Sequence, residues 1–250
     1  MLVDGQNFRS IWRDKTSGVI HIIDQRWLPH EFKIVELNSL IDAVNSIRDM
    51  WVRGAPLIGV TAAYGMALAM AKNATDGNVQ SASQELCSAR PTAINLYWAV
   101  ERLKSCLLQV EESERFKVAL TLLDSIAEED IAANKKIGEF GYQIIKEIAE
   151  LKTDNSPVRI LTHCNAGWLA TVDIGTATAP IYEANSKGIE LEVWVDETRP
   201  RNQGASLTTW ELLHNKIPHT LIVDNAGGHL MQKGQLDICI VGSDRTTSTG

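Results

Sequence analysis

The chain has 250 residues, 44% of them hydrophobic and 22% charged, and its 24 Lys and Arg against 31 Asp and Glu give a net charge of −7. This composition is that of a folded globular protein, and it excludes a disordered or collagen-like chain. The net negative charge and the lack of a Lys or Arg run argue against a surface for nucleic acid or anionic lipid, although a small anionic substrate needs only a local pocket. The length predicts two domains.

No targeting or metal-binding signature stands out. The longest apolar stretch, residues 57–71, is shorter than the roughly 18–20 residues of a membrane span, so it predicts a buried helix. Asp4 and Arg9 lie where a secretory signal would have its apolar core, and we expect a cytoplasmic protein. The cysteine spacing fits neither a metal knuckle nor a disulfide framework and predicts free thiols. The cysteines are Cys87, Cys106, Cys164 and Cys239. No metal is expected.

The N-terminal half begins as a small β-hairpin and continues as helices. Residues 10–13 and the apolar run 19–23 lie on either side of a turn-forming Lys-Thr-Ser-Gly cluster, which predicts the hairpin. Apolar residues then recur every three or four positions over 40–47 and 96–107, and residues 112–148 are helical in pattern with one charged face. We therefore predict a mostly helical domain with a small antiparallel β element.

After a polar linker at 152–157 the pattern changes to short β-branched runs that alternate with amphipathic stretches. The four runs are residues 158–162, 191–195, 220–223 and 238–241. Helical stretches begin near Gly167, Ala205 and Ala226. Apolar strands alternating with helices predict a parallel sheet covered on both faces. The predicted fold class is α/β, with a helical domain over residues 1–152 and a Rossmann-like domain over 153–250.

Polar residues follow all four predicted strands, at the edge where ligands bind in such sheets. The segments are His163-Cys164-Asn165, Asp196-Glu197-Thr198-Arg199, Asp224-Asn225 and Gly242-Ser243-Asp244-Arg245. A thiol, carboxylates and arginines at one edge are more than a structural sheet needs, which favours a functional site. The alternative for any one Asp or Asn is a cap of a turn or helix.

Cys164 is the strongest candidate for chemistry, because it lies between a strand and an Asn-Ala-Gly turn near a helix start. Such a position lowers the pKa of a thiol. The alternative is a buried structural cysteine. Strand alternation directs His163 to the opposite face of the sheet, which argues against a nucleophilic pair of these two neighbours, although His229 could approach Cys164.

Two arginines precede predicted helix starts in the N-terminal half. Arg53-Gly54-Ala55-Pro56 leads into the apolar helix, and Arg90-Pro91-Thr92 has the same design. Free backbone N–H groups at a helix start, together with a guanidinium group, suit a phosphate. The alternative is a simple capped helix start. Two such segments in one domain favour an anionic ligand.

These blocks, in this order, resemble the S-methyl-5-thioribose-1-phosphate isomerase family of methionine salvage. The matching segments are Arg53-Gly54-Ala55-Pro56-Leu57-Ile58-Gly59, Ala89-Arg90-Pro91-Thr92-Ala93-Ile94-Asn95-Leu96, Thr162-His163-Cys164-Asn165-Ala166-Gly167, Val195-Asp196-Glu197-Thr198-Arg199-Pro200, Gln203-Gly204-Ala205 and Gly242-Ser243-Asp244-Arg245. The family is related to isomerases of ribose 1,5-bisphosphate and to regulatory subunits of the translation-initiation exchange factor.

The resemblance implies an aldose–ketose isomerase that uses no cofactor and forms a homodimer through the Rossmann-like half. The residues that it implies for binding the phosphorylated sugar are Arg53, Gly54, Ala55, Arg90 and Gln203. It also implies that Cys164 and Asp244 carry the chemistry. The two alternatives are an isomerase of 5-deoxyribose 1-phosphate or ribose 1,5-bisphosphate and a non-catalytic regulatory subunit.

Several features depart from the family pattern. Trp168, Asp173 and Pro180 are unusual in the segment after Cys164, and the indole either reshapes the pocket for the sugar's 5-substituent or packs against the other domain. Family members continue beyond the position of Gly250 with an Asn-Lys pair and further strands. We therefore expect the sheet to be C-terminally truncated in this sequence.

Overall fold

The computed structural model describes residues 1–154, 156–243 and 247–249. The chain divides into two compact units. We call them the Rossmann-like unit, residues 1–8, 132–169 and 173–250, and the helical unit, residues 9–131 and 170–172. The domain boundary between residues 152 and 153 stays a prediction.

The helical unit combines a three-stranded antiparallel sheet with helices. The strands are β3 (Ile11–Arg13), β4 (Ile20–Ile23) and β5 (Ile34–Leu37), in that spatial order. The helices are α1 (Leu40–Arg48), α2 (Ala55–Lys72), α3 (Asp76–Ala89), α4 (Ile94–Leu107) and residues 112–131 of α5 (Glu112–Leu151). Ile11 pairs with Ile22 and Arg13 with Ile20, which confirms the predicted hairpin.

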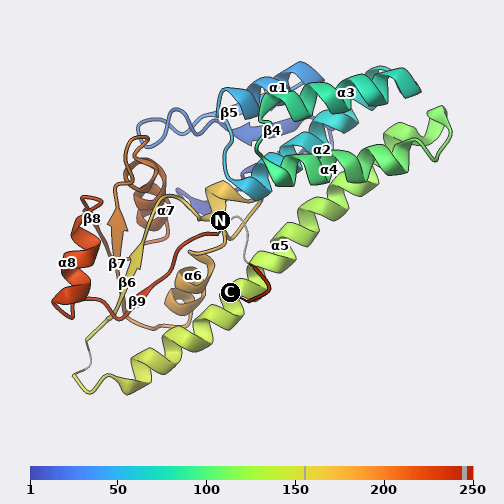
Figure 1. Cartoon of the computed structure of the whole chain (residues 1–250). Helices are drawn as coiled ribbons and strands as arrows, with labels where there is room; N and C mark the ends of the chain where they lie inside the picture. Colours follow the sequence, from blue (N-terminus) through green and yellow to red (C-terminus); the bar gives the residue numbers. More distant parts are fainter. Residues whose placement is uncertain (155, 244–246, 250) are drawn as a thin grey trace. The chain divides into compact units, whose positions relative to one another are not determined.

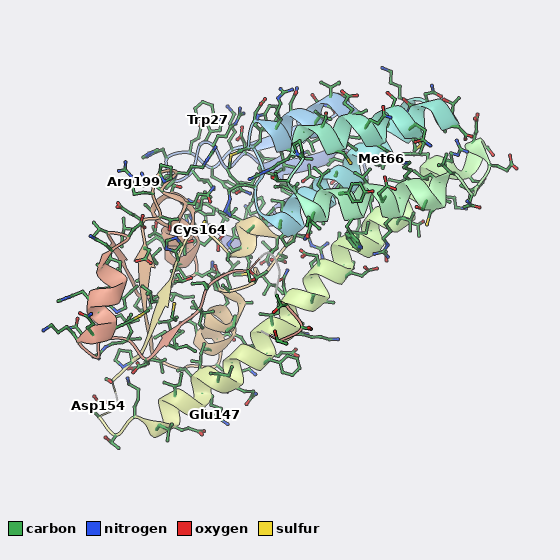
Figure 2. All side chains as sticks on the ribbon, in the orientation of Figure 1. Trp27, Met66, Glu147, Asp154, Cys164 and Arg199 are labelled. Carbon is green, nitrogen blue, oxygen red and sulfur yellow. The ribbon has the colours of Figure 1, made fainter. Side chains whose placement is uncertain are left out.

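Helix α2 forms the centre of the helical unit. It is apolar on every side, and residues such as Met66 are fully buried (Figure 2). Among the described residues it is the one helix long and apolar enough to cross a membrane by length and composition, but 72% of it is buried inside the protein, as in a core helix. Gly59 lets α2 approach α4 closely, because a Cβ there would come within 2.9 Å of the Asn95 carbonyl oxygen.

The Rossmann-like unit contains a four-stranded parallel sheet and a short N-terminal hairpin. The sheet strands are β6 (Val158–Thr162), β7 (Leu191–Asp196), β8 (His219–Ile222) and β9 (Ile238–Cys239), and the hairpin strands are β1 (Leu2–Val3) and β2 (Gln6–Asn7). The spatial order is β8-β7-β6-β9, so in chain order the strands run 3-2-1-4, as in half of a Rossmann fold. The predicted α/β, Rossmann-like class is confirmed.

Helices cover both faces of this sheet (Figure 1). Besides residues 132–151 of α5, they are α6 (Ala179–Ser186), the π-helical turn η2 (Gly204–Thr208), α7 (Thr209–His214) and α8 (Ala226–Gln232). Ile160 and Val193 face a core shared with Ile181 of α6. The alternate residue Leu161 faces Gly227 of α8. The residues that end each strand are thus held at one edge by a packed sheet.

The segment after Cys164 differs from its prediction. Instead of a helix from Gly167, it forms only the three-residue 3₁₀ turn η1 (Trp168–Ala170), and α6 begins at Ala179. The backbone N–H groups of Trp168 and Leu169 donate to the buried Glu211 side chain. A carboxylate from a distant segment therefore anchors this short turn.

Candidate active site

The order of the strands indicates the edge of the sheet at which a ligand would bind. β6 pairs with β7 on one side and with β9 on the other, so the direction of winding reverses beside β6. Ligands of such sheets bind beyond the carboxyl ends of the strands at this reversal. Cys164 lies two residues after Thr162, the last residue of β6.

The backbone of Cys164 is held on both sides by threonine hydroxyl groups. Its φ of 61° lies in the left-handed region. Its N–H donates to Oγ1 of Thr198 at 2.7 Å, and its carbonyl oxygen accepts from Oγ1 of Thr208 at 2.6 Å. The thiol of Cys164, which is labelled in Figure 2, is half-buried. It donates to Oε1 of Gln203 at 3.1 Å. The structure therefore brings Cys164 and Gln203 together.

A fully buried carboxylate anchors the loop that follows Cys164. Glu211 accepts hydrogen bonds from Asn165 Nδ2 and Leu169 N, both at 2.9 Å, from Trp168 N at 3.2 Å and from the Tyr182 hydroxyl at 2.7 Å. Burial and the negative charge of Glu211 hold the pKa of Tyr182 well above its ordinary value. No sequence motif pointed to Glu211, because it lies within an ordinary helical pattern.

His163 and Cys164 have different hydrogen-bond partners, as strand alternation predicts. Its Nδ1 lies 3.1 Å from Oδ2 of Asp196; the Asp196 side chain is 8% exposed and that of His163 is 48% exposed. Burial raises the pKa of Asp196, although its hydrogen bond with His163 opposes the rise. A buried carboxylate beside an exposed imidazole can fix which ring nitrogen of His163 faces solvent.

Asp224 caps the turn after β7. Its two carboxylate oxygens accept from the backbone N–H groups of Thr198, at 2.6 Å, and Arg199, at 2.7 Å. The capping alternative, left open from the sequence, therefore describes Asp224.

Trp168 does not line an open pocket. Its side chain has no exposed surface, and its ring centroid lies 6.0 Å from that of Trp210 in the same unit. The indole contributes to the interior behind the Cys164 loop.

The Arg53-Gly54-Ala55 segment lies at the start of α2 in the helical unit. Gly54 is the N-cap, with φ 95° and no side-chain cap, and Pro56 stands in the first turn. A Cβ at Gly54 would overlap Ala170, so this position requires glycine. Arg53 is only 4% exposed. The uncapped N–H groups beside a buried guanidinium group are suited to an anion.

One guanidinium nitrogen of Arg90 is buried without a hydrogen-bond acceptor among the described residues. It is the C-cap residue of α3, in the same unit as Arg53, and α4 begins four residues later at Ile94. Its Nη1 is buried and has no hydrogen-bond partner among the described residues. A bound anion would satisfy this donor.

The remaining predicted site residue, Asp244, lies outside the described residues. Within the described part of the chain, no group of three or more His, Cys, Asp or Glu side chains is arranged to hold a metal ion. Thr198 and Thr208 were not singled out from the sequence as site residues. Thr198 lay in a strand-end block, but only the fold shows that both hydroxyls meet the Cys164 peptide.

Comparisons with known proteins assign this chain to a family. The sequence model of the "Initiation factor 2 subunit family" matches residues 51–250. Proteins named methylthioribose-1-phosphate isomerase from Brucella anthropi and Rhizobium meliloti are 57% and 55% identical to the chain over all 250 of its residues, which span 69% of each relative.

Two solved structures are similar over 96% of this chain. One, named 5-methylthioribose 1-phosphate isomerase from Pyrococcus horikoshii, has a TM-score of 0.84 and 34% identity, with 67% of that chain covered. The other, named translation initiation factor eIF-2B, subunit delta, from A. fulgidus, has a TM-score of 0.82 and 38% identity, with 69% of that chain covered.

Proposed function

The chain belongs to the initiation factor 2 subunit family, and from this premise we propose that it is an isomerase that converts S-methyl-5-thioribose 1-phosphate into S-methyl-5-thioribulose 1-phosphate. The observation that carries the proposal is the thiol of Cys164, fixed beside Gln203 at the edge where strand order reverses. Identity above 50% to relatives named for this reaction supports the choice of substrate.

The substrate explains why an acid and a thiol are both needed. Its anomeric oxygen carries the phosphate, so the ring cannot open as a free hemiacetal does. In the proposed mechanism Asp244 protonates the ring oxygen and the bond from that oxygen to C1 breaks. This leaves an oxocarbenium ion at C1, and the C2 hydrogen moves to C1 with its electron pair while Cys164 stabilises the developing charge. The C2 hydroxyl then gives its proton to the Asp244 carboxylate and becomes the ketone, which restores the acid. The atoms balance without an oxidant or reductant, so the reaction needs no redox cofactor.

The phosphate is proposed to bind at Arg53, Gly54, Ala55 and Arg90. The uncapped start of α2 and the unsatisfied, buried Nη1 of Arg90 support this role. Gln203 is proposed to bind the sugar, and its contact with the Cys164 thiol supports that assignment.

The test is incubation of the purified protein with candidate sugar phosphates, with ketose formation followed by NMR. We expect conversion of S-methyl-5-thioribose 1-phosphate, with slower conversion of 5-deoxyribose 1-phosphate and of ribose 1,5-bisphosphate. Asp244→Asn and Cys164→Ser should each lower the rate about 10²-fold or more. Cys106→Ser, at an exposed thiol of the helical unit, is the matched control and should keep the rate.

Three outcomes would contradict the proposal. Preference for ribose 1,5-bisphosphate would assign the chain to the related sugar-phosphate isomerases. Binding without turnover would favour a regulatory subunit, in line with the similar A. fulgidus protein, which is named as a translation initiation factor subunit. Full activity in Cys164→Ser would move the chemistry to another strand end.

We further propose a cytoplasmic enzyme that forms a homodimer through its Rossmann-like unit. Sedimentation equilibrium tests the dimer: a mass of twice the 27.6 kDa chain is expected, and a monomer at assay concentration would contradict it.

A further inference from the structure

The left-handed backbone of Cys164 needs an explanation in the fold. At φ 61° the Cβ atom crowds the backbone, and residues other than glycine, asparagine and aspartate rarely adopt this conformation. Contacts from elsewhere in the chain must therefore hold the Cys164 peptide.

Two threonine hydroxyls supply these contacts from segments 34 and 44 residues away along the chain. Oγ1 of Thr198 accepts from Cys164 N and donates its own hydrogen to the Asp196 carbonyl oxygen at 3.0 Å. On the other side, Oγ1 of Thr208 donates to the Cys164 carbonyl oxygen and accepts from Nδ2 of Asn165 at 3.1 Å. Each hydroxyl thus has one donor and one acceptor, so its hydrogen has a single direction.

The surroundings leave both hydroxyls little freedom. Thr208 is 1% exposed, and Asn165, which fixes it, is itself bound to Glu211. At Gly204 a Cβ would overlap the Asp196 carbonyl oxygen and lie 3.2 Å from Oγ1 of Thr198. The turn η2 therefore packs directly against the Thr198 contact.

We propose that Thr198 and Thr208 are positioning residues that hold the Cys164 peptide in its left-handed conformation and so direct the thiol to Gln203. The inference rests on the proposed role of Cys164 in the isomerase reaction. Neither hydroxyl needs to touch the substrate. Their loss should therefore lower kcat and leave KM nearly unchanged, because a small displacement of a reacting group slows chemistry more than binding.

The experiment replaces each threonine in the full chain by valine, which removes the hydroxyl at constant shape, and by serine, which keeps it. Thr198→Val and Thr208→Val should lower kcat about 10–100-fold with KM changed less than about threefold, and both serine variants should stay within about threefold of the parent. Thr209→Val is the matched control, because the hydroxyl of Thr209 bonds to Ala205 in its own helical turn rather than to Cys164. It should keep kcat.

A second measurement does not depend on turnover. The valine variants should alkylate faster with iodoacetamide at Cys164, by about threefold or more, because the half-buried thiol is released from Gln203. The rate is read from the Cys164 peptide by mass spectrometry and compared with the exposed Cys106. Unchanged alkylation in both valine variants would overturn the proposal, as would serine variants impaired as much as the valine variants. If Cys164→Ala keeps full turnover, the proposed function fails, and the alkylation rates alone still decide the positioning role.

Discussion

Replacing Glu211 by glutamine tests the buried anchor of the Cys164 loop. In the structure Oε1 accepts from Asn165 and Leu169, and Oε2 accepts from Trp168 and Tyr182. Glutamine keeps the size but turns one oxygen into an NH₂ donor. Whichever way the amide lies, one buried backbone N–H, that of Trp168 or Leu169, then faces a donor. An unsatisfied buried group costs about 1–3 kcal/mol, so we expect that loss of unfolding free energy.

The assay is thermal unfolding followed by circular dichroism at neutral pH. For a chain of this size each kcal/mol should lower Tm by about 2–4 °C. Glu183→Gln is the matched control, because its carboxylate makes a surface ion pair with Lys187 at 3.0 Å, and such a pair is worth less than about 1 kcal/mol. A Glu211→Gln protein as stable as the parent, or more stable, would refute the reasoning. It would mean that the desolvation free energy of the buried Glu211 charge exceeds the stabilisation from its hydrogen bonds.

Three further predictions concern other sites. Gly54→Ala should lower the free energy of unfolding by at least about 2 kcal/mol in a urea titration, because its φ of 95° and the overlap with Ala170 exclude a Cβ. The control Gly77→Ala, with open space around it in α3, should be neutral or stabilising in the same titration. The raised pKa of Asp196 means that its protonated form favours the folded state. Its contribution to stability is therefore full below the unfolded-state pKa of about 3.9 and is lost as the pH rises through the folded-state pKa. The Tm of Asp196→Asn should rise relative to that of the parent between pH 4 and pH 7, and a constant Tm difference would contradict this. Burial raises the pKa of the partly buried Cys87, so at pH 8 iodoacetamide should label Cys87 more slowly than the exposed Cys106. The reverse order by peptide mass spectrometry would show the burial argument to be wrong.

The sequence was most informative where burial alone sets the conformation. The run Val158–Thr162 is a strand with the predicted bounds, because it is central in the sheet and apolar side chains are required on both faces. Helix α2 likewise starts at Ala55, two residues before the predicted start near Leu57, because Gly54 and Pro56 act through their own backbone geometry. Local rules suffice in both places.

The candidate site could be predicted only in part. The edge of the sheet and Cys164 follow from the strand pattern, and Gln203 followed from the family resemblance. The hydroxyls on the Cys164 peptide and the carboxylate of Glu211 depend on contacts between segments more than 30 residues apart. Hydrogen bonds at such separations leave no periodic signal in the sequence. The helix predicted from Gly167 was also wrong, because the segment forms only the three-residue turn η1, whose Trp168 and Leu169 N–H groups donate to Glu211.

The pairing of β6 with β9 has a consequence for synthesis of the chain on the ribosome. β6 ends at Thr162 and gains its first neighbour with β7, but its other edge stays unpaired until Ile238 and Cys239 have been made. At typical elongation rates of about 5–20 residues per second this interval lasts about 4–15 s. During it the nascent protein exposes an apolar strand edge, which is a template for pairing with another chain. Slow translation between these two strands should therefore favour aggregation of this protein more than slow translation within the helical unit does.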